Sequence, residues 1–205
     1  MTNVLSLPNP HALDQALALL RAGEPIAFPT DTVYGVGALA LDSAAVRRLY
    51  AVKRRPPTLA IPLLIADRAD LALVAAEVPP LARRLERLWP GALTLVVPAA
   101  PQLPAALLAG GTTVAVRLPD HDWLRDLIRA LGAPLAATSA NVHGGRDPRT
   151  AAEVVAQLGD ALSLVVDGGP TPGPVPSTIV DCTGPQPRLL REGALPWGRI
   201  VAEVG

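Results

Sequence analysis

The stretch PTDTVYGVG, residues 29–37, directly follows the short apolar run PIAF. It holds three hydroxyl groups, one carboxylate and two glycines in nine residues. An apolar run of this length is typical of a buried strand. Ligands of open α/β sheets usually bind beyond the ends of strands, and glycine lets the backbone approach a ligand closely. The stretch therefore predicts part of a binding site at the edge of a sheet.

Apolar periodicity divides the rest of the chain into helices and strands. Asn9 and Pro10 predict the N-cap and first residue of a helix that stops at Gly23. Asp42 and Thr150 predict two further N-caps. The predicted helices cover residues 11–22, 43–52, 67–76, 80–89, 122–131 and 151–158; the predicted strands cover residues 25–28, 61–65, 93–97, 113–118, 134–138, 162–167, 177–181 and 187–191.

The order of these elements predicts the fold class. Helices and strands alternate early and strands cluster late, which favours an α/β fold around a mixed sheet over a purely parallel one. The sequence shows no internal repeat and no clear linker, so we expect one domain over residues 1–205. The composition of GGPTPGPVP, residues 168–176, is typical of a loop or hinge.

Composition restricts the partners and the compartment. Lys plus Arg equals Asp plus Glu at 18 each, so global charge predicts no attraction to nucleic acid or membrane. Prolines and glycines interrupt the uncharged stretch 90–116, which excludes a single spanning helix there. Cys182 is the only cysteine, and the start MTNVLSLPNP has no basic region typical of a signal peptide. We expect a cytoplasmic protein without an internal disulfide.

Several segments that follow apolar runs combine cations with hydroxyl groups. Lys53, the single lysine beside 17 arginines, stands in KRRPP, and Arg117 ends the apolar run TVAV. This inventory suits an anionic ligand with several oxygens, such as a triphosphate or a carboxylate. The cations are Lys53, Arg54, Arg55, Arg117 and Arg191; the neutral groups are Thr30, Thr32, Thr138, Ser139, Asn141, Ser177 and Thr178.

Structural interpretations of these segments remain open. KRRPP can be a solvated helix end, TSAN a turn whose side chains bond their own backbone, and PSTIVD a strand with a polar start. GVGALA fits a dinucleotide fingerprint, but no acid stands between Asp42 and Asp67, where that fingerprint needs one. His11, His121 and His143 lack metal-ligand spacing, so we expect no metal bound directly by the protein.

Taken together, the segments resemble the YrdC/Sua5 (TsaC) family of threonylcarbamoyl-AMP synthases. The matching blocks, in order, are PTDTVYGVGALA, KRRPP, PGALTLVV, VAVRLPDH, PLAATSANVHG, PSTIVD and LLREGAL. They extend over most of the chain, and the chain resembles the short, single-domain type. The resemblance implies a twisted, mostly open mixed α/β sheet with flanking helices and a concave groove.

The resemblance also implies a reaction. Enzymes of this family condense L-threonine, bicarbonate and ATP into L-threonylcarbamoyladenylate and pyrophosphate, which serves formation of N6-threonylcarbamoyladenosine (t6A) in tRNA. Mg²⁺ is implied as a cofactor bound through the ATP phosphates. The implied partners are ATP, L-threonine, bicarbonate, and further tRNA or t6A-transfer proteins, with no membrane.

Site roles follow from the matching blocks. Lys53 and Arg55 are implied as the catalytic pair at the carbamate and phosphates. Threonine binding is implied for Thr32, Tyr34, Arg117 and Ser177, with Arg117 on the carboxylate, and ATP binding for Lys53, Arg55, Thr138, Ser139, Asn141 and Arg191.

The chain departs from the family pattern at two positions. Leu59 stands where relatives often carry Lys or Asn, and His143 where they usually carry Ser, so no role is assigned to either. Two alternative functions remain: a non-catalytic RNA-binding module, which the neutral charge disfavours, and carbamoyl transfer. The second belongs to larger hydrogenase-maturation proteins, whose other domains this length does not include.

Overall fold

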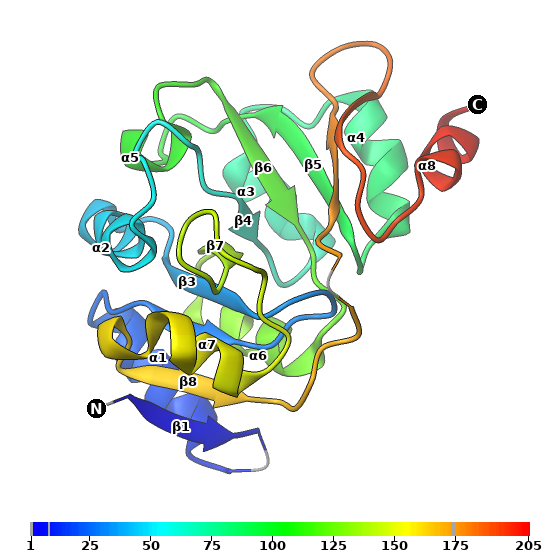
Figure 1. The fold of residues 1–205 in the computed structure, drawn as a ribbon. Helices are drawn as coiled ribbons and strands as arrows, with labels where there is room; N and C mark the ends of the chain where they lie inside the picture. Colours follow the sequence, from blue (N-terminus) through cyan, green and yellow to red (C-terminus); the bar gives the residue numbers. More distant parts are fainter. Residues whose placement is uncertain (1, 8, 174) are drawn as a thin grey trace.

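The protein forms one ten-stranded mixed sheet flanked by helices (Figure 1). The computed structural model describes residues 2–7, 9–173 and 175–205; Met1 and Pro8 of the N-terminal segment and Pro174 of the predicted loop lie outside the described residues. The order across the sheet is β1-β8-β2-β3-β7-β4-β6-β5-β9-β10. The strands are β1 (Asn3–Ser6), β2 (Ile26–Phe28), β3 (Gly35–Leu39), β4 (Leu63–Leu64), β5 (Leu93–Pro98), β6 (Thr113–Arg117), β7 (Leu135–Ser139), β8 (Leu164–Asp167), β9 (Thr178–Asp181) and β10 (Arg188–Arg191).

Parallel and antiparallel pairs alternate irregularly across the sheet. The pairs β1/β8, β2/β8, β4/β6 and β5/β9 are parallel, and the other five are antiparallel. The sheet is open, since β1 and β10 form its two edges. The predicted mixed α/β sheet with flanking helices is confirmed.

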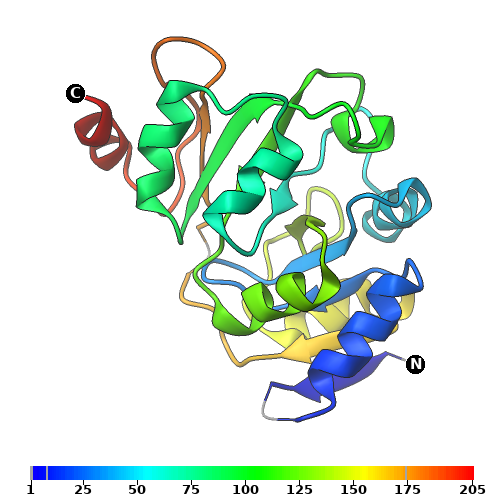
Figure 2. The same ribbon diagram turned by 180° about the vertical axis from the view of Figure 1, so that it is seen from behind.

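Helices cover both faces of the sheet. The helices α1, α3, α4 and α6 lie behind the sheet in Figure 1 and in front of it in Figure 2, whereas α7 lies on the opposite face. The helices are α1 (Ala12–Arg21), α2 (Ser43–Lys53), α3 (Leu71–Val74), α4 (Pro80–Leu85), α5 (Ala105–Leu108), α6 (Asp122–Leu131), α7 (Ala151–Leu158) and α8 (Trp197–Val204), with short 3-10 turns at Arg68–Asp70, Glu86–Leu88 and Gly159–Ala161.

Side-chain alternation sends neighbouring strand residues into two hydrophobic cores. In β2, Ile26 and Phe28 pack with α1 and α6, while Ala27, between them, joins the larger core. The same division separates Leu135 from Ala136 in β7. The apolar strands that follow one another in sequence are therefore buried on both faces, which explains why they read as continuous apolar runs.

The strand β3 depends on its glycines. A Cβ at Gly35 would lie 2.9 Å from the Phe28 ring, and one at Gly37 would lie 2.9 Å from the Ala136 carbonyl oxygen. Glycine at both positions lets β3 pass between β2 and β7. Sequence patterning did not predict this strand, because its glycines and alanines carry a weak strand signal; it also missed β1, α5 and α8.

Three predicted helix boundaries were wrong. The predicted helix 67–76 is a 3-10 turn followed by one turn of α3, because Ala75 turns extended and forms a bridge with Ala99. The predicted helix 80–89 leaves α geometry after Leu85, and Trp89 is extended ahead of Pro90, as residues before proline prefer. Helix α1 begins at Ala12, because Asn9 instead accepts a hydrogen bond from the His11 amide.

Candidate active site

Arg117 is a buried cation at the end of β6, only 7% exposed. Its Nη2 forms an ion pair with Asp31 Oδ1 at 2.7 Å, and its Nη1 donates to Thr32 Oγ1 at 2.9 Å. Its Nε donates to the Gly91 carbonyl oxygen at 3.0 Å. The guanidinium therefore has a carboxylate, a hydroxyl and a carbonyl as partners, as a buried charge requires.

The hydroxyl groups of residues 29–37 have different surroundings. Thr30 Oγ1 lies 3.1 Å from Thr32 Oγ1 and donates to the Val33 carbonyl at 2.7 Å. The Tyr34 hydroxyl donates to the Gly169 carbonyl at 2.8 Å and accepts from the Gly168 amide at 3.1 Å. Burial raises the pKa of Tyr34 to about 12. Thr30 and Thr32 thus lie beside Arg117, whereas Tyr34 holds the segment after β8.

Lys53, the last residue of α2, is a second buried cation and is 2% exposed. Its Nζ donates to the carbonyl oxygens of Ser139 and Asn141, the latter at 2.8 Å, and to Asn141 Oδ1 at 3.1 Å. Burial lowers the pKa of Lys53 to about 8, the Arg55 charge adds to this, and the Asp147 carboxylate opposes it. All three N–H bonds of the ammonium therefore point to oxygens of the loop that follows β7.

The loop after β7 is organised around the Asn141 side chain. Ser139 Oγ donates to Asn141 Oδ1 at 2.6 Å, so this oxygen accepts from both Ser139 and Lys53. Asn141 Nδ2 donates to the Gly145 carbonyl at 2.7 Å. Thr138 lies one residue earlier in β7, opposite Val36 of β3. The TSAN segment is thus a turn that its own side chains stabilise, and it also surrounds a buried ammonium.

Arg55 lies beside this cluster but bonds its own turn. Its Nε donates to the Leu59 carbonyl at 3.2 Å and its Nη2 to the Ala60 carbonyl at 3.0 Å. The intervening Arg54 is exposed and adopts the left-handed conformation, with φ of 51°. Lys53 and Arg55 therefore point into different surroundings: Lys53 into the protein and Arg55 along the 55–60 turn.

A third group joins the start of β9 to the end of β10. Ser177 Oγ lies 2.7 Å from Thr94 Oγ1, and Arg191 donates through Nε and Nη2 to the Ser177 carbonyl at 3.1 and 2.8 Å. A Cβ at Gly193 would lie 2.2 Å from the Pro176 carbonyl oxygen. Only glycine allows the chain after Arg191 to pass this close to the start of β9.

Electrostatic interactions connect the groups around Arg117, Lys53 and Arg191. Partial burial lowers the pKa of Arg191, the Asp147 carboxylate opposes this, and the Arg117 charge adds to it. Asp147 also acts on Lys53. Thr94, the neighbour of Ser177, is the cross-strand partner of Arg117. Thr94 and Ser177 thus connect Arg117 with Arg191, and Asp147 acts electrostatically on both Arg191 and Lys53.

Sequence reasoning missed two members of this region. Asp31 was counted as a carboxylate but not as the partner of Arg117, and Asp147 was not considered. Its place in the polar stretch GGRDPRT, residues 144–150, gave no signal that Asp147 lies near two cations. A signal for Asp31 was present, because a buried arginine in an apolar strand needs a charged or hydrogen-bonding partner.

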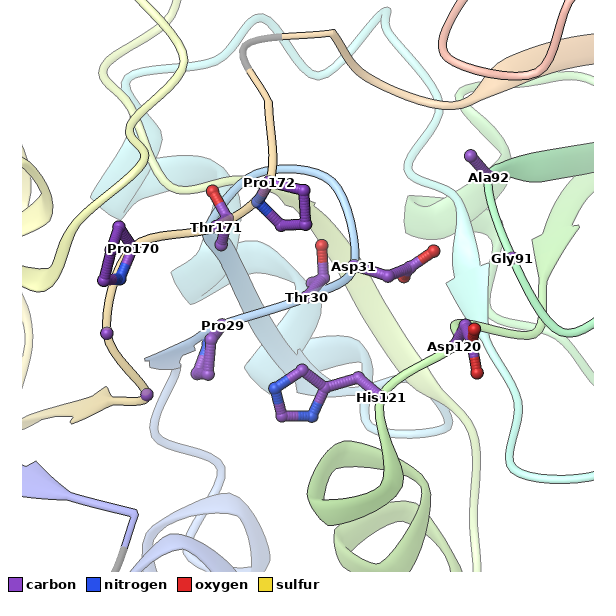
Figure 3. Close-up of a pocket in the computed structure, with 12 residues that line it drawn as sticks. Pro29, Thr30, Asp31, Gly91, Ala92, Asp120, His121, Pro170, Thr171 and Pro172 are labelled. Carbon is purple, nitrogen blue, oxygen red and sulfur yellow. The ribbon is translucent and has the colours of Figure 1, made fainter.

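A pocket of about 540 Å³ adjoins the Arg117 group (Figure 3). Figure 3 shows Asp31 extending from the 29–31 segment toward Gly91 and Ala92, with His121 and Thr171 nearby. None of the residues that the resemblance assigns to threonine or ATP lines it; the lining consists of Pro29, Thr30, Asp31, Gly91, Ala92, Asp120, His121, Gly168, Gly169, Pro170, Thr171 and Pro172. Asp31 and Gly91 connect the pocket to the guanidinium, since both bond Arg117.

Metal-ligating clusters and membrane-spanning helices are both absent from the described residues. Among the described residues, no group of three or more His, Cys, Asp or Glu side chains could hold a metal ion. No helix within residues 2–7, 9–173 and 175–205 is both long enough and apolar enough to cross a bilayer. The donors around Lys53 and Arg117 suit an anion better than a bare cation.

Comparison with known proteins gives a consistent set of relatives. The Sua5/YciO/YrdC family model, described as "Telomere recombination", matches residues 18–193. The chain is 42% identical to the threonylcarbamoyl-AMP synthase of Bacillus subtilis and 41% identical to that of Pyrococcus abyssi, over 100% and 93% of its length. It spans only 60% and 56% of those two relatives.

A solved structure agrees with these relatives in fold. The crystal structure of P. abyssi Sua5 complexed with L-threonine superposes with a TM-score of 0.94 at 38% identity. The match covers all of this chain and 61% of that one.

Proposed function

The chain belongs to the Sua5/YciO/YrdC family, and from that premise we propose that it is a nucleotidyltransferase, an L-threonylcarbamoyladenylate synthase. The proposed substrates are L-threonine, bicarbonate and ATP, and the products are threonylcarbamoyl-AMP and pyrophosphate. Relatives named threonylcarbamoyl-AMP synthase and the Sua5 structure complexed with L-threonine support this proposal.

One observation carries the proposal beyond the family. Two buried cations of different kinds, Arg117 and Lys53, flank a region that also holds Arg191 and the hydroxyl of Ser177. A guanidinium fork matches a carboxylate, and an ammonium matches a phosphate as a point charge. This arrangement suits a ligand with a carboxylate at one end and phosphates at the other.

The proposed reaction requires positioning more than a protein nucleophile. The threonine nitrogen takes up bicarbonate and loses water, giving a carbamate. A carbamate oxygen then forms a bond to the α-phosphorus of ATP while the bond to the bridging oxygen breaks and pyrophosphate leaves. Alignment and charge neutralisation can supply most of the rate of such a step.

In this scheme each cation has a proposed role. Arg117 holds the threonine carboxylate with Thr32 and Ser177, and Tyr34 shapes this end by fixing residues 168–169. Lys53, Arg55 and Arg191 neutralise the phosphates, and Thr138, Ser139 and Asn141 contact ATP. Lys53 already bonds three oxygens of the 139–141 turn, so a phosphate contact requires exchange of at least one of them.

Mg²⁺ enters the proposal with the nucleotide. The described residues provide no cluster of acidic or histidine ligands for it, which fits a metal held through the ATP phosphates. When bound, it would neutralise phosphate charge during displacement. We further propose a cytoplasmic protein that passes its product to tRNA through t6A-transfer proteins.

Pyrophosphate release tests the proposed function. We expect release from ATP only when both L-threonine and bicarbonate are present. Release with ATP alone, or equal release with any amino acid, would contradict it. Tight tRNA binding without pyrophosphate release would instead support the alternative of an RNA-binding module, and its loss with rising salt would identify phosphate contacts as the cause.

A further inference from the structure

Asp31 belongs to two environments at once. Its Oδ1 pairs with Arg117 Nη2 at 2.7 Å, and its side chain lines the pocket of about 540 Å³. The carboxylate is 14% exposed and the guanidinium side chain 9% exposed, so the pair is largely shielded from water. The strength of such a pair depends on its geometry, because desolvation opposes the attraction.

The partners of Arg117 fix it from three directions. Asp31 and Thr32 bond the two Nη atoms, while the Gly91 carbonyl bonds Nε. An arginine side chain has five N–H donors. Three are used within the described part of the chain, and one N–H remains on each Nη atom for a ligand. Of the three partners, only Asp31 carries a charge.

We propose that Asp31 is a positioning residue for threonine binding, acting through Arg117. It holds the guanidinium in the one orientation in which the two remaining N–H groups face the substrate carboxylate. This inference rests on the proposed function, because it takes the ligand of Arg117 to be the carboxylate of threonine. Asp31 does not itself touch ATP in this scheme.

Asp31 differs from the other acid of the pocket in its contact with Arg117. Asp120 also lines the pocket, but it is exposed and makes no bond to Arg117. If the pocket acted on threonine simply through negative charge, both acids would matter equally. If Asp31 acts through Arg117, only Asp31 matters.

Steady-state kinetics test this distinction. Asp31→Asn keeps the shape and the acceptor atom but removes the charge that orients the guanidinium. We expect the KM for threonine to rise about tenfold, with kcat within about threefold and the KM for ATP within about twofold. Asp120→Asn is the matched control and should leave all three constants unchanged.

A double-variant cycle shows whether Asp31 acts through Arg117. In an Arg117→Met background, Asp31→Asn should produce no further rise in the KM for threonine. A further tenfold rise there, or an equal rise in the KM for ATP in the single variant, would overturn the inference. Pyrophosphate release by the unmodified protein keeps the two questions apart, because its absence contradicts the proposed function itself.

A crystal structure of the Asp31→Ala variant gives a result that needs no activity. We expect the Arg117 guanidinium to leave its bond to Thr32 Oγ1 and turn toward the space vacated by the carboxylate. A guanidinium that keeps its bonds to Thr32 and Gly91 in that variant would show that Asp31 does not position it.

Discussion

The Arg117 and Lys53 regions both bury a cation, but they stabilise it by different means. Arg117 faces a carboxylate at 2.7 Å, with a hydroxyl and a carbonyl completing its partners. Lys53 is bonded only by carbonyl and amide oxygens of the 139–141 turn. One charge is neutralised by an opposite charge, and the other is solvated by dipoles in place of water.

The Arg117 end of the site is therefore preformed, whereas the charge at the Lys53 end depends on its surroundings. The Arg117 region has its counter-ion in place before any ligand binds. Among the described residues, no carboxylate is hydrogen bonded to the Lys53 ammonium. Burial lowers its pKa to about 8, so its charge depends on pH and on the charge of a nearby ligand. An anion at Lys53 would supply the missing negative charge.

The largest expected effect comes from breaking the charge pair. Arg117→Leu leaves Asp31 buried without its partner, which should lower the free energy of unfolding by about 3–5 kcal/mol. Urea denaturation measures it. The matched control is Arg188→Leu: Arg188 also pairs with an aspartate at 2.7 Å but is 72% exposed, and that aspartate, Asp181, keeps its hydrogen bonds from Thr183. The control should lose less than about 1 kcal/mol, and equal losses would show that burial does not distinguish the two pairs.

Removal of the dipole-solvated cation should act mainly on turnover. Lys53→Met keeps most of the length of the side chain but removes the charge proposed to face the phosphates, so pyrophosphate release should fall about 100-fold. Arg54→Asn is the control: Arg54 is exposed and left-handed, a conformation that asparagine tolerates. Turnover of Lys53→Met within threefold of the unmodified protein would refute the placement of Lys53 at the phosphates.

The lowered pKa of Lys53 predicts that the stability of the protein depends on pH. Between pH 8 and 10.5 the unfolded chain binds more protons at Lys53 than the folded protein does, so the Lys53 contribution to stability rises with pH. From pH 8 to 10 the unmodified protein should gain about 2 kcal/mol relative to Lys53→Met. Other groups titrate in both proteins and cancel. Parallel stability curves would contradict the expectation.

The smallest effect should come from Ser139→Ala. This change removes the hydroxyl that donates to Asn141 Oδ1, but it keeps the backbone carbonyl that accepts from Lys53. We expect a loss of about 1 kcal/mol in unfolding free energy and a folded 139–141 turn. Thermal denaturation checks it, with Asn141→Ala as the comparison, since that change removes the oxygen that accepts from Lys53 and Ser139 and the amide nitrogen that donates to Gly145. Equal losses would place the strength of the turn in the Ser139 hydroxyl.

Much of the fold could be predicted from the sequence, and the elements that the prediction missed were missed for physical reasons. Apolar runs identified eight of the ten strands, because burial on both faces leaves few polar residues within them. The strand β3 was missed because its glycines are required by close contacts with the Phe28 ring and the Ala136 carbonyl. These groups are neighbours in space but not in sequence. The exposed edge strand β1 was missed because it is short and its residues are mostly exposed.

The site was predictable as a set of chemical groups but not as a set of contacts. Charges and hydroxyls after apolar runs marked Lys53, Arg117, Asn141 and Ser177, and the structure draws these residues into one region. The sequence could not show that the Tyr34 hydroxyl forms hydrogen bonds with the backbone of residues 168–169. Their roles toward threonine and ATP stay predictions until ligands are bound.

The strand order has a consequence for synthesis of the protein on the ribosome. Strand β8 pairs with β1 and is one of the two partners of β2. It lies much later in the chain than either of them. The core around Ile26 and Phe28 therefore lacks its β8 members, Leu164 and Val166, until residue 167 has emerged. Such long-range pairing is slow and leaves apolar surface open to chaperones. Nascent chains stalled before β8 should be cleaved by protease around β2, whereas chains released after it should resist.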